Sequence, residues 1–437
     1  MKNIFTVIIG ISLFFGCTSN TPKKHIESPN NKPVKVTLKN TNGKFQLFVN
    51  NNPFYIKGAG LEFGNITSLA KHKGNSFRTW RTNNGKQSGK EVLDEAYKNN
   101  LYVTMGIEVA RERHGFDYND SIAVKEQFLR IKKEVLELKD HPALIIWAIG
   151  NELNLRHTNP KVWNAVNDIS KMIHKIDTNH LTTTTLAGIS KNEISLIKER
   201  ASDIDLLSIQ MYGDLPALPK MVREYGWEKA YMVTEWGATG HWEVPTTKWG
   251  APIEENSTEK AANYLKRYKS GIESDSTQCV GSYVFLWGQK QERTPTWYGI
   301  FLENGNETES VDVMHYIWNN SWPVNRTPQV ELFQLNGKTA YENIILEADE
   351  IVDASAIIND FENDEIQFTW EILSESTDLQ DGGDKEKRPE NISFEIINQQ
   401  KGQLTFKTPK TGNYRLFVYA GDGNNHAATA NIPFKVK

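Results

Sequence analysis

Two glutamates end strongly apolar runs of the chain. Glu152 ends the run Leu-Ile-Ile-Trp-Ala-Ile-Gly-Asn-Glu, and Glu235 ends the run Tyr-Met-Val-Thr-Glu. Both runs have the length and apolar character of buried β-strands. A pair of carboxyls held at strand ends suits general acid/base and nucleophilic catalysis. Cleavage of a glycosidic bond needs such a pair, because one carboxyl protonates the leaving oxygen and the other attacks or stabilises the anomeric carbon.

The sequence around these glutamates alternates between strand-like and helical patterns. Apolar strand-like runs occupy residues 54–60, 76–81, 102–108, 144–152, 181–188, 206–213, 231–237 and 281–288. Helical patterns lie between them at residues 90–99, 123–138, 160–176 and 258–274. Eight buried strands, most followed by a helix, predict an α/β fold of the (β/α)₈ TIM-barrel type. An open doubly wound sheet is the competing fold, but residues 58–62 lack its glycine-rich phosphate turn.

The start of the chain has the pattern of a bacterial lipoprotein. Residues 1–17 combine Lys2, an apolar run too short to span a membrane, and the ending Leu-Phe-Phe-Gly-Cys. Cys17 is the predicted lipidation site, and residues 18–33 form a predicted flexible tether. We therefore expect a lipid anchor through Cys17 in the outer membrane of a bacterial cell envelope, on its periplasmic or surface face. Simple secretion is the alternative.

Two domains follow the tether. Residues 34–327 are the predicted barrel, which begins with a β-hairpin around Asn42-Gly43. Residues 328–437 predict an immunoglobulin-like β-sandwich, because short strand patterns and turns alternate there without helical signals. Its seven predicted strands are residues 339–347, 351–358, 366–372, 392–397, 402–407, 414–419 and 432–436. We expect the sandwich to act as a spacer, and its charged loops at 360–364 and 381–388 to be solvated rather than to bind a cation.

Composition narrows the classes of ligand. The net charge is −4, which does not suit a nucleic-acid partner. The chain has neither a His-Glu-x-x-His motif nor a Gly-x-x-x-x-Gly-Lys loop, and it has only two cysteines, so we expect no metal site, no nucleotide and no other cofactor. Twelve Trp, 15 Tyr and 19 Phe provide flat rings on which sugars stack. The expected partner is a polysaccharide or oligosaccharide substrate, and the expected state is a monomer.

The motifs at the two glutamates resemble those of a large clan of retaining glycoside hydrolases. Gly-Asn-Glu ends at Glu152 and Glu-Trp-Gly begins at Glu235, on predicted strands four and seven. The resemblance covers the whole barrel, roughly residues 53–325. It implies that Glu152 is the acid/base and that Glu235 is the nucleophile. It also implies that Asn151 binds the sugar 2-hydroxyl.

Other candidate residues fit the same resemblance. It implies that Arg78 lies beside the nucleophile and keeps it ionised, with a structural ion pair as the alternative. It implies that Tyr212 contacts the same carboxylate, with core packing as the alternative. Trp287 resembles the aromatic floor of the clan's sugar subsite. Three more residues at strand ends are expected to bind substrate: Trp80, Glu108 and Trp236.

The arrangement as a whole resembles glycoside hydrolase family 158, the endo-β-1,3-glucanases. The shared features are the lipoprotein start, a single barrel without leading β-domains, and one C-terminal immunoglobulin-like domain. This resemblance implies hydrolysis of laminarin-type β-glucan by double displacement. A family 2-like exo-β-glycosidase, such as a β-mannosidase or a β-galactosidase, is the alternative. A non-catalytic glycan-binding lipoprotein is the alternative from another class, but it would be expected to have lost one of the two glutamates.

Overall fold

The computed structural model describes residues 32–437 of the chain. The predicted signal peptide and Cys17 lie outside the described residues, so the lipid anchor and the cell-envelope location stay predictions. In the part of the chain that is described, no helix is long and apolar enough to cross a membrane.

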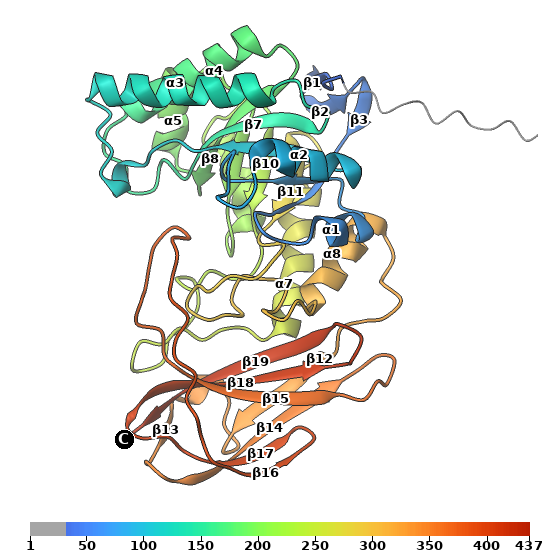
Figure 1. The fold of residues 1–437 in the computed structure, drawn as a ribbon, viewed down its shortest axis with the longest axis vertical. Coiled ribbons are helices and arrows are strands. Elements are labelled where there is room, and N and C mark those ends of the chain that lie inside the picture. Colours follow the sequence, from blue (N-terminus) through green and yellow to red (C-terminus); the bar gives the residue numbers. More distant parts are fainter. Residues whose placement is uncertain (1–31) are drawn as a thin grey trace, which may run out of the picture. The chain divides into compact units, whose positions relative to one another are not determined.

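Parallel strands close a barrel within residues 56–284 (Figure 1). Their order around the barrel is β10-β11-β4-β5-β6-β7-β8-β9. The strands are β4 (Ile56–Gly60), β5 (Ser76–Arg78), β6 (Tyr102–Ile107), β7 (Leu144–Asn151), β8 (Leu181–Ala187), β9 (Leu207–Gln210), β10 (Tyr231–Glu235) and β11 (Cys279–Val284). Each predicted strand is present, and the two glutamates follow or end the fourth and seventh. The predicted (β/α)₈ barrel is confirmed.

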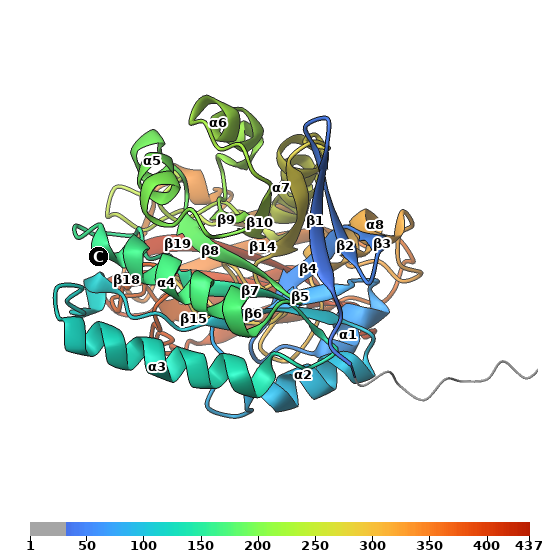
Figure 2. The same cartoon turned by 90° about the horizontal axis from the view of Figure 1, so that it is seen from above.

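Helices connect the strands and lie outside them, as Figure 2 shows for α2 to α5. The helices are α1 (Ile66–Lys71), α2 (Gly89–Lys98), α3 (Ser121–Leu138), α4 (Lys161–Ile176), α5 (Lys191–Arg200), α6 (Leu218–Glu224), α7 (Ser257–Arg267) and α8 (Glu309–Asn319). In α4, the apolar residues Val162, Val166, Ile169 and Ile173 recur at helical spacing and are buried. Helices α1 and α6 were not predicted because six or seven residues are too few to show that period. Helices α5 and α8 were not predicted either.

A small sheet closes the N-terminal end of the barrel. Its strands are β1 (Val36–Thr41), β2 (Lys44–Val49) and β3 (Asn52–Phe54). Asn42 and Gly43 both have positive φ, which the tight turn of a two-residue hairpin requires. Leu47 and Val49 pack in one buried cluster with residues at the starts of the barrel strands. The C-terminal end of the barrel is therefore the one left for chemistry.

The C-terminal domain is a sandwich of two four-stranded sheets within the described residues. One sheet has the order β12 (Gln329–Leu335), β14 (Ile351–Asn359), β17 (Gln403–Lys407) and β16 (Ile396–Gln400). The other has the order β13 (Ile344–Leu346), β19 (Ala427–Val436), β18 (Gly412–Gly421) and β15 (Gln367–Ser374). The predicted sandwich is confirmed. Strand β12 was not predicted, and an irregularity between Val330 and Leu332 breaks the alternation on which such a prediction depends.

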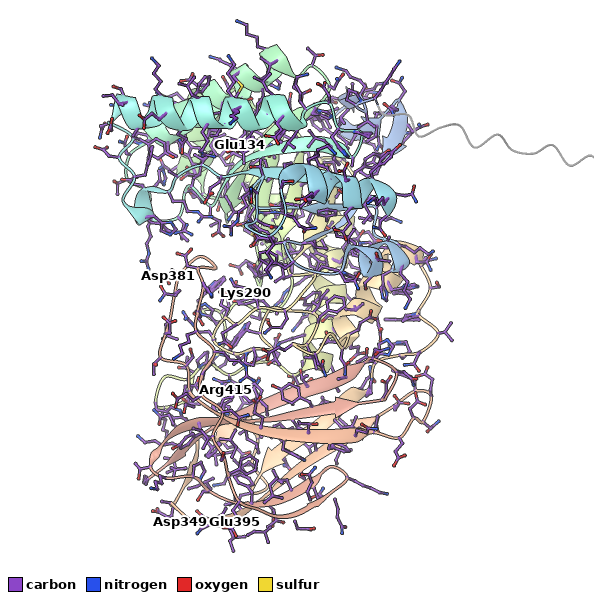
Figure 3. All side chains as sticks on the ribbon, viewed as in Figure 1. Glu134, Lys290, Asp349, Asp381, Glu395 and Arg415 are labelled. Atoms are coloured by element: carbon purple, nitrogen blue, oxygen red, sulfur yellow. The ribbon has the colours of Figure 1, made fainter. Side chains whose placement is uncertain are left out.

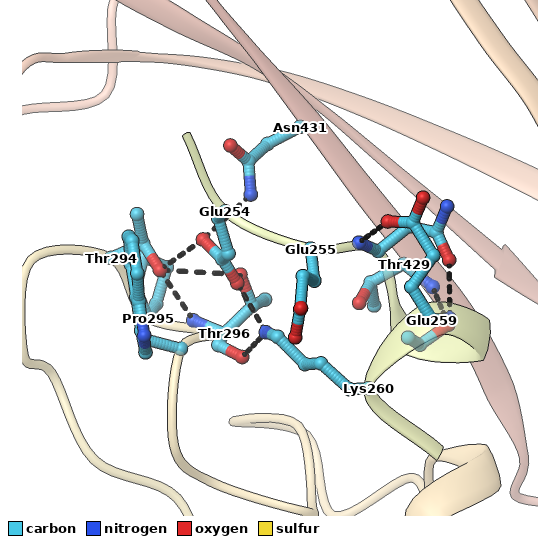
Figure 4. A network of polar contacts seen from close by, with 12 residues as sticks. Glu254, Glu255, Glu259, Lys260, Thr294, Pro295, Thr296, Thr429 and Asn431 are labelled. Carbon is cyan, nitrogen blue, oxygen red and sulfur yellow. Dashed lines mark hydrogen bonds and ion pairs between the residues drawn. The ribbon is translucent and has the colours of Figure 1, made fainter. Parts of the chain in front are cut away.

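A buried ionic network joins the barrel to the sandwich (Figure 4). Glu254 accepts hydrogen bonds from Lys260 Nζ at 2.5 Å, Thr294 Oγ1 at 2.6 Å, Thr296 Oγ1 at 2.8 Å and Asn431 Nδ2 at 2.7 Å. Asn431 lies on β19 of the sandwich, and the other partners belong to the barrel. Burial opposes the charge of Glu254, but Lys260 and the hydroxyl donors outweigh it and lower the pKa of the carboxyl.

Replacing Lys260 with methionine is therefore expected to destabilise the protein. The change leaves a buried carboxylate without its cation, which costs about 3–5 kcal/mol of unfolding free energy. Urea titration of the wild type and the variant measures this loss. Lys266→Met on the exposed face of the same helix is the matched control, with an expected change below about 1 kcal/mol. Equal effects of the two substitutions would contradict the conclusion that Lys260 compensates a buried negative charge on Glu254 between the two domains.

Candidate active site

Glu235 lies at the end of β10 and is held by three donors, two at or just after the end of β5 and one just after β9. Trp80 Nε1 donates to its Oε1 at 2.8 Å, and Tyr212 Oη donates to its Oε2 at 3.1 Å. Arg78 Nη1 lies 3.3 Å from Oε1 and forms a buried ion pair. Burial, and next the charge of Glu235, raises the pKa of Tyr212 well above its usual value, so the phenol stays protonated and donates. Glu235 therefore faces one cation and two hydrogen-bond donors.

Arg78 links Glu235 to Asn151. Its Nη2 donates to Asn151 Oδ1 at 2.7 Å, and its Nη1 donates to the Thr234 carbonyl at 3.3 Å. Gln210 Nε2 donates to the same oxygen of Asn151 at 2.8 Å. The two donors fix the orientation of the Asn151 amide and leave its NH₂ group without a partner among residues 32–437. That group is available to a ligand.

Glu152 follows β7 directly and has a positive φ of 53°, which is uncommon for a residue other than glycine. The backbone around it is fixed: its N–H donates to the Thr185 carbonyl at 2.9 Å, and its own carbonyl accepts from Arg113 Nη1 at 3.3 Å. Arg111 Nε donates to the neighbouring Asn151 carbonyl at 3.1 Å. Surrounding residues therefore hold a strained conformation that directs the carboxyl.

The Glu152 carboxyl favours its protonated form. Burial, and next the charge of Glu235, raises its pKa to about 7, while the charges of Arg113, Arg111 and Arg78 act in the opposite direction. The site therefore contains one carboxyl paired with a cation and a second whose pKa is raised to about 7. Two titratable groups whose environments separate their protonation states are typical of an acid and a nucleophile.

Further aromatic rings pack on Trp80 and Tyr212, the two aromatic donors to Glu235. Phe285, just after β11, packs edge-on against Trp80 and Tyr212, with ring centroids 5.9 and 6.3 Å apart. Trp242 packs edge-on against Tyr212 at 5.7 Å and is 60% exposed. A ring that is both anchored and exposed is suited to stacking on a sugar.

Two predicted substrate-binding residues lie elsewhere. Trp236 is 0% exposed and packs on Tyr264 and Tyr268. Trp287 is also 0% exposed and packs on Phe301 and Trp318. Because neither ring has a face open to a ligand, the prediction that Trp236 and Trp287 bind substrate is wrong in this structure.

The remaining candidates lie at the C-terminal end of the barrel. Arg78, Trp80 and Tyr212 contact Glu235 directly, and Asn151 is joined to it through Arg78. Glu108 is exposed and lines a cavity of about 350 Å³ on the loop after β6, together with residues 109–111 and 114–116. Arg111 lines the same cavity and also contacts the Asn151 carbonyl, next to Glu152.

Five residues of the site were not identified from the sequence: Gln210, Arg111, Arg113, Trp242 and Phe285. Gln210 ends β9 and therefore could have been found as another polar residue at a strand end. The two arginines lie on a loop, where no periodic pattern indicates which side chains turn toward the barrel. Phe285 lies in the same apolar run as Trp287, and the sequence does not distinguish the two.

Carboxylates also gather in the sandwich. Oxygens of Asp360, Asp364 and Asp422 lie within 4.8 Å of one another. Asp364 accepts from Asn424 Nδ2 at 2.8 Å, and Asp422 accepts from Asn325 Nδ2 at 2.7 Å. Such acidic loops are common without an ion, and this cluster does not by itself define a metal site.

Fold and site together define a (β/α)₈ barrel with two carboxyls in different protonation environments at strands four and seven. No protein-family model matches the chain, and no curated protein matches it either. The chain is similar in structure to the β-D-glucuronidase of Dictyoglomus thermophilum, with a TM-score of 0.51 and 16% identity over 66% of this chain and 54% of that chain. It is also similar to Bacteroides uniformis β-glucuronidase, with a TM-score of 0.51 and 13% identity over 92% of this chain and 48% of that chain.

A putative β-galactosidase from Bacteroides fragilis also has a similar structure, with a TM-score of 0.50 and 11% identity over 92% of this chain and 57% of that chain. The chain spans about half the length of these solved structures. At such identities the likeness establishes the shared fold.

Proposed function

We propose that the protein is a retaining β-glycoside hydrolase in which Glu152 is the acid/base and Glu235 is the nucleophile. The observation that carries this proposal is the different surroundings of the two carboxyls, one paired with a cation and hydrogen-bond donors and the other buried beside it. Arg78, Trp80 and Tyr212 stabilise negative charge on Glu235. Burial and the negative charge of Glu235 raise the pKa of Glu152 to about 7. Retaining glycosidases need one carboxyl in each state at the start of the reaction.

The residues can perform both halves of a double displacement. In the first step, Glu235 attacks the anomeric carbon while Glu152 transfers its proton to the glycosidic oxygen, which leaves as an alcohol. In the second step, Glu152 takes a proton from water, which attacks the glycosyl ester and releases Glu235. The free NH₂ group of Asn151 donates to the sugar 2-hydroxyl, a contact that strengthens in the transition state.

Within this class, an exo-acting β-glycosidase is supported better than an endo-β-1,3-glucanase. The solved structures that share this fold include β-glucuronidases and a putative β-galactosidase. They support the resemblance to family 2 rather than the one to family 158. We therefore propose that the enzyme removes single sugars from chain ends or from small β-glycosides.

A substrate panel followed by ¹H NMR tests this function. The panel contains aryl β-glucuronide, β-galactoside, β-mannoside and β-glucoside, together with linear β-1,3-glucan. We expect turnover of one of the aryl glycosides, with the β-anomer of the sugar as the first product. Release of internal oligosaccharides from the polymer would instead support the endo-glucanase. An α-anomer as the first product would overturn the retaining mechanism, and binding of glycan without turnover of any substrate would support the non-catalytic alternative.

The proton on Glu152 makes activity depend on pH. Because Glu152 must be protonated to act as the acid, kcat/KM should fall as the pH rises through about 7, the pKa of that carboxyl. The measurement is a pH profile of kcat/KM with a substrate whose leaving group needs protonation. With a 2,4-dinitrophenyl glycoside the fall should be much weaker, because that leaving group departs without a proton. An unchanged rate up to pH 9 with the poor leaving group would contradict the role of Glu152.

A further inference from the structure

One loop of the sandwich reaches the C-terminal end of the barrel. It consists of residues 375–395, between β15 and β16, and Figure 1 shows it in orange, leaving the sandwich strands. Arg415 anchors the start of this loop: its guanidinium donates to Glu375 at 2.7 Å and to the Pro252 carbonyl of the barrel at 2.8 Å. Figure 3 labels Arg415 and also Asp381, which lies near the far end of the loop.

The far end of this loop, residues 380–386, is called the loop tip below, and it contacts the loops that follow three barrel strands. Beyond β11, Lys290 Nζ donates to the Gly383 carbonyl at 2.7 Å, and Arg293 pairs with Glu386 at 2.5 Å. Beyond β7, Arg156 pairs with Asp381. Beyond β6, His114 Nε2 lies 2.9 Å from Asp384 Oδ2. Glu386 is 3% exposed and so departs from the expected solvated loop, whereas Asp381, Lys385 and Lys387 are exposed.

The loop tip fits closely against the barrel. Gly382 has a φ of 59°, in the left-handed region that favours glycine. A Cβ atom at this position would lie 2.7 Å from both Arg113 Nη2 and Leu155 Cδ2. The absence of a side chain at Gly382 is therefore what allows the loop to touch Arg113.

Arg113 connects the loop tip to Glu152. Its Nη2 donates to the Gly382 carbonyl at 3.3 Å, and its Nη1 donates to the Glu152 carbonyl at 3.3 Å. Asp384 lies 3.9 Å from the same guanidinium. One buried arginine thus bridges the backbone of the acid/base and a loop that comes from the other domain.

Asp384 also contacts a second residue of the loop after β6. His114 Nε2 lies 2.9 Å from Asp384 Oδ2, and on the same loop Arg111 Nε donates to the Asn151 carbonyl, next to Glu152. The leaving oxygen has to come within hydrogen-bond reach of Glu152 to receive its proton, so a displaced Glu152 impairs this proton transfer first.

We propose that the loop tip of the sandwich is part of the active site: it positions Glu152 through Arg113, and its Asp384 holds the loop after β6 through His114. This inference rests on the proposed glycosidase function. It makes the sandwich a contributor to catalysis rather than a spacer. Arg113, Gly382 and Asp384 are positioning residues, since each acts through another group.

Two substitutions test this role, each with a matched control. Gly382→Ala displaces Arg113, and Gly423→Ala is its control, because Gly423 also has a positive φ but has open space around it. Asp384→Ala removes the partner of His114 and Arg113, and Asp349→Ala, which removes an exposed ion pair with Lys407, is its control. Circular dichroism and the thermal midpoint verify that each variant folds.

The readout is kcat/KM with a poor and an activated leaving group on the same sugar. We expect Gly382→Ala and Asp384→Ala to lose about tenfold with the poor leaving group, because the acid is misplaced, and less than about twofold with 2,4-dinitrophenolate. Controls should behave as the wild type. Equal losses with both leaving groups, or no loss with either, would overturn the positioning role. A wild-type protein that hydrolyses neither substrate would instead overturn the proposed function.

Discussion

Replacing Glu235 with alanine is expected to lower kcat/KM by about 10⁵-fold on every substrate, whatever its leaving group. The nucleophile forms the glycosyl-enzyme, so its loss blocks the first step for poor and activated leaving groups alike. The measurement compares a 2,4-dinitrophenyl glycoside with an unactivated glycoside of the same sugar. Because Glu235 also neutralises the buried Arg78, Glu235→Gln should be made in parallel, since it keeps a polar group of the same size beside the arginine.

Adding azide shows whether the group lost in this variant is the nucleophile, because the configuration of the azide product reveals the face of attack. In Glu235→Ala, azide enters the vacated space and attacks from the face that the carboxylate occupied, so the product should be an α-glycosyl azide. Glu255→Ala is the matched control: Glu255 also lies on the segment after β10 and accepts hydrogen bonds from Thr239 and Asn263. It should retain activity within about tenfold of the wild type. A β-glycosyl azide from Glu235→Ala would reverse the assigned roles of the two glutamates.

The barrel and its two glutamates could be predicted because the barrel strands are buried and apolar. Strands β7 and β10 are completely made of buried residues and end in polar ones, so the runs stand out in the sequence. Parallel strands bring their C-terminal ends to one side of the barrel, and this brings together side chains that are far apart along the chain. Arg78 and Tyr212 were placed by the family resemblance, and the structure brings both to Glu235.

The error at Trp236 has a simple geometric reason. Successive side chains of a strand point to opposite faces, so a residue next to Glu235 points away from the site. Trp236 accordingly packs outside the barrel strands, on Tyr264 of α7. Trp287 lies beyond the end of β11, where the strand period no longer applies, and it packs on Trp318 of α8.

The contact between the sandwich loop and the barrel could not be predicted at all. Arg113 and Gly382 are 269 residues apart in the chain, and each lies on a loop without periodic pattern. Charged residues such as Asp384 and Glu386 are normally solvated, and only the fold reveals their partners. Sequence patterns indicate which elements form, but they do not indicate which loops of two domains meet.

Replacing Glu152 with alanine should have an effect that depends on the leaving group. The variant lacks the proton donor, so kcat/KM should fall by about 10²–10⁴-fold for an unactivated glycoside. For a 2,4-dinitrophenyl glycoside the first step should be nearly unchanged, because dinitrophenolate leaves without a proton. The second step then lacks its base, so the glycosyl-enzyme should accumulate and give a burst of dinitrophenolate.

Azide should then restore turnover of the Glu152→Ala variant, because azide attacks the glycosyl-enzyme without needing a base. Attack comes from the face opposite to Glu235, so the product should be a β-glycosyl azide, which NMR distinguishes from the α-product of Glu235→Ala. Glu108→Ala is the matched control, since Glu108 is another carboxylate at the C-terminal end of the barrel, just after β6, and should give neither a burst nor an azide product. An α-azide from Glu152→Ala, or equal losses with both leaving groups, would show that Glu152 is not the acid/base.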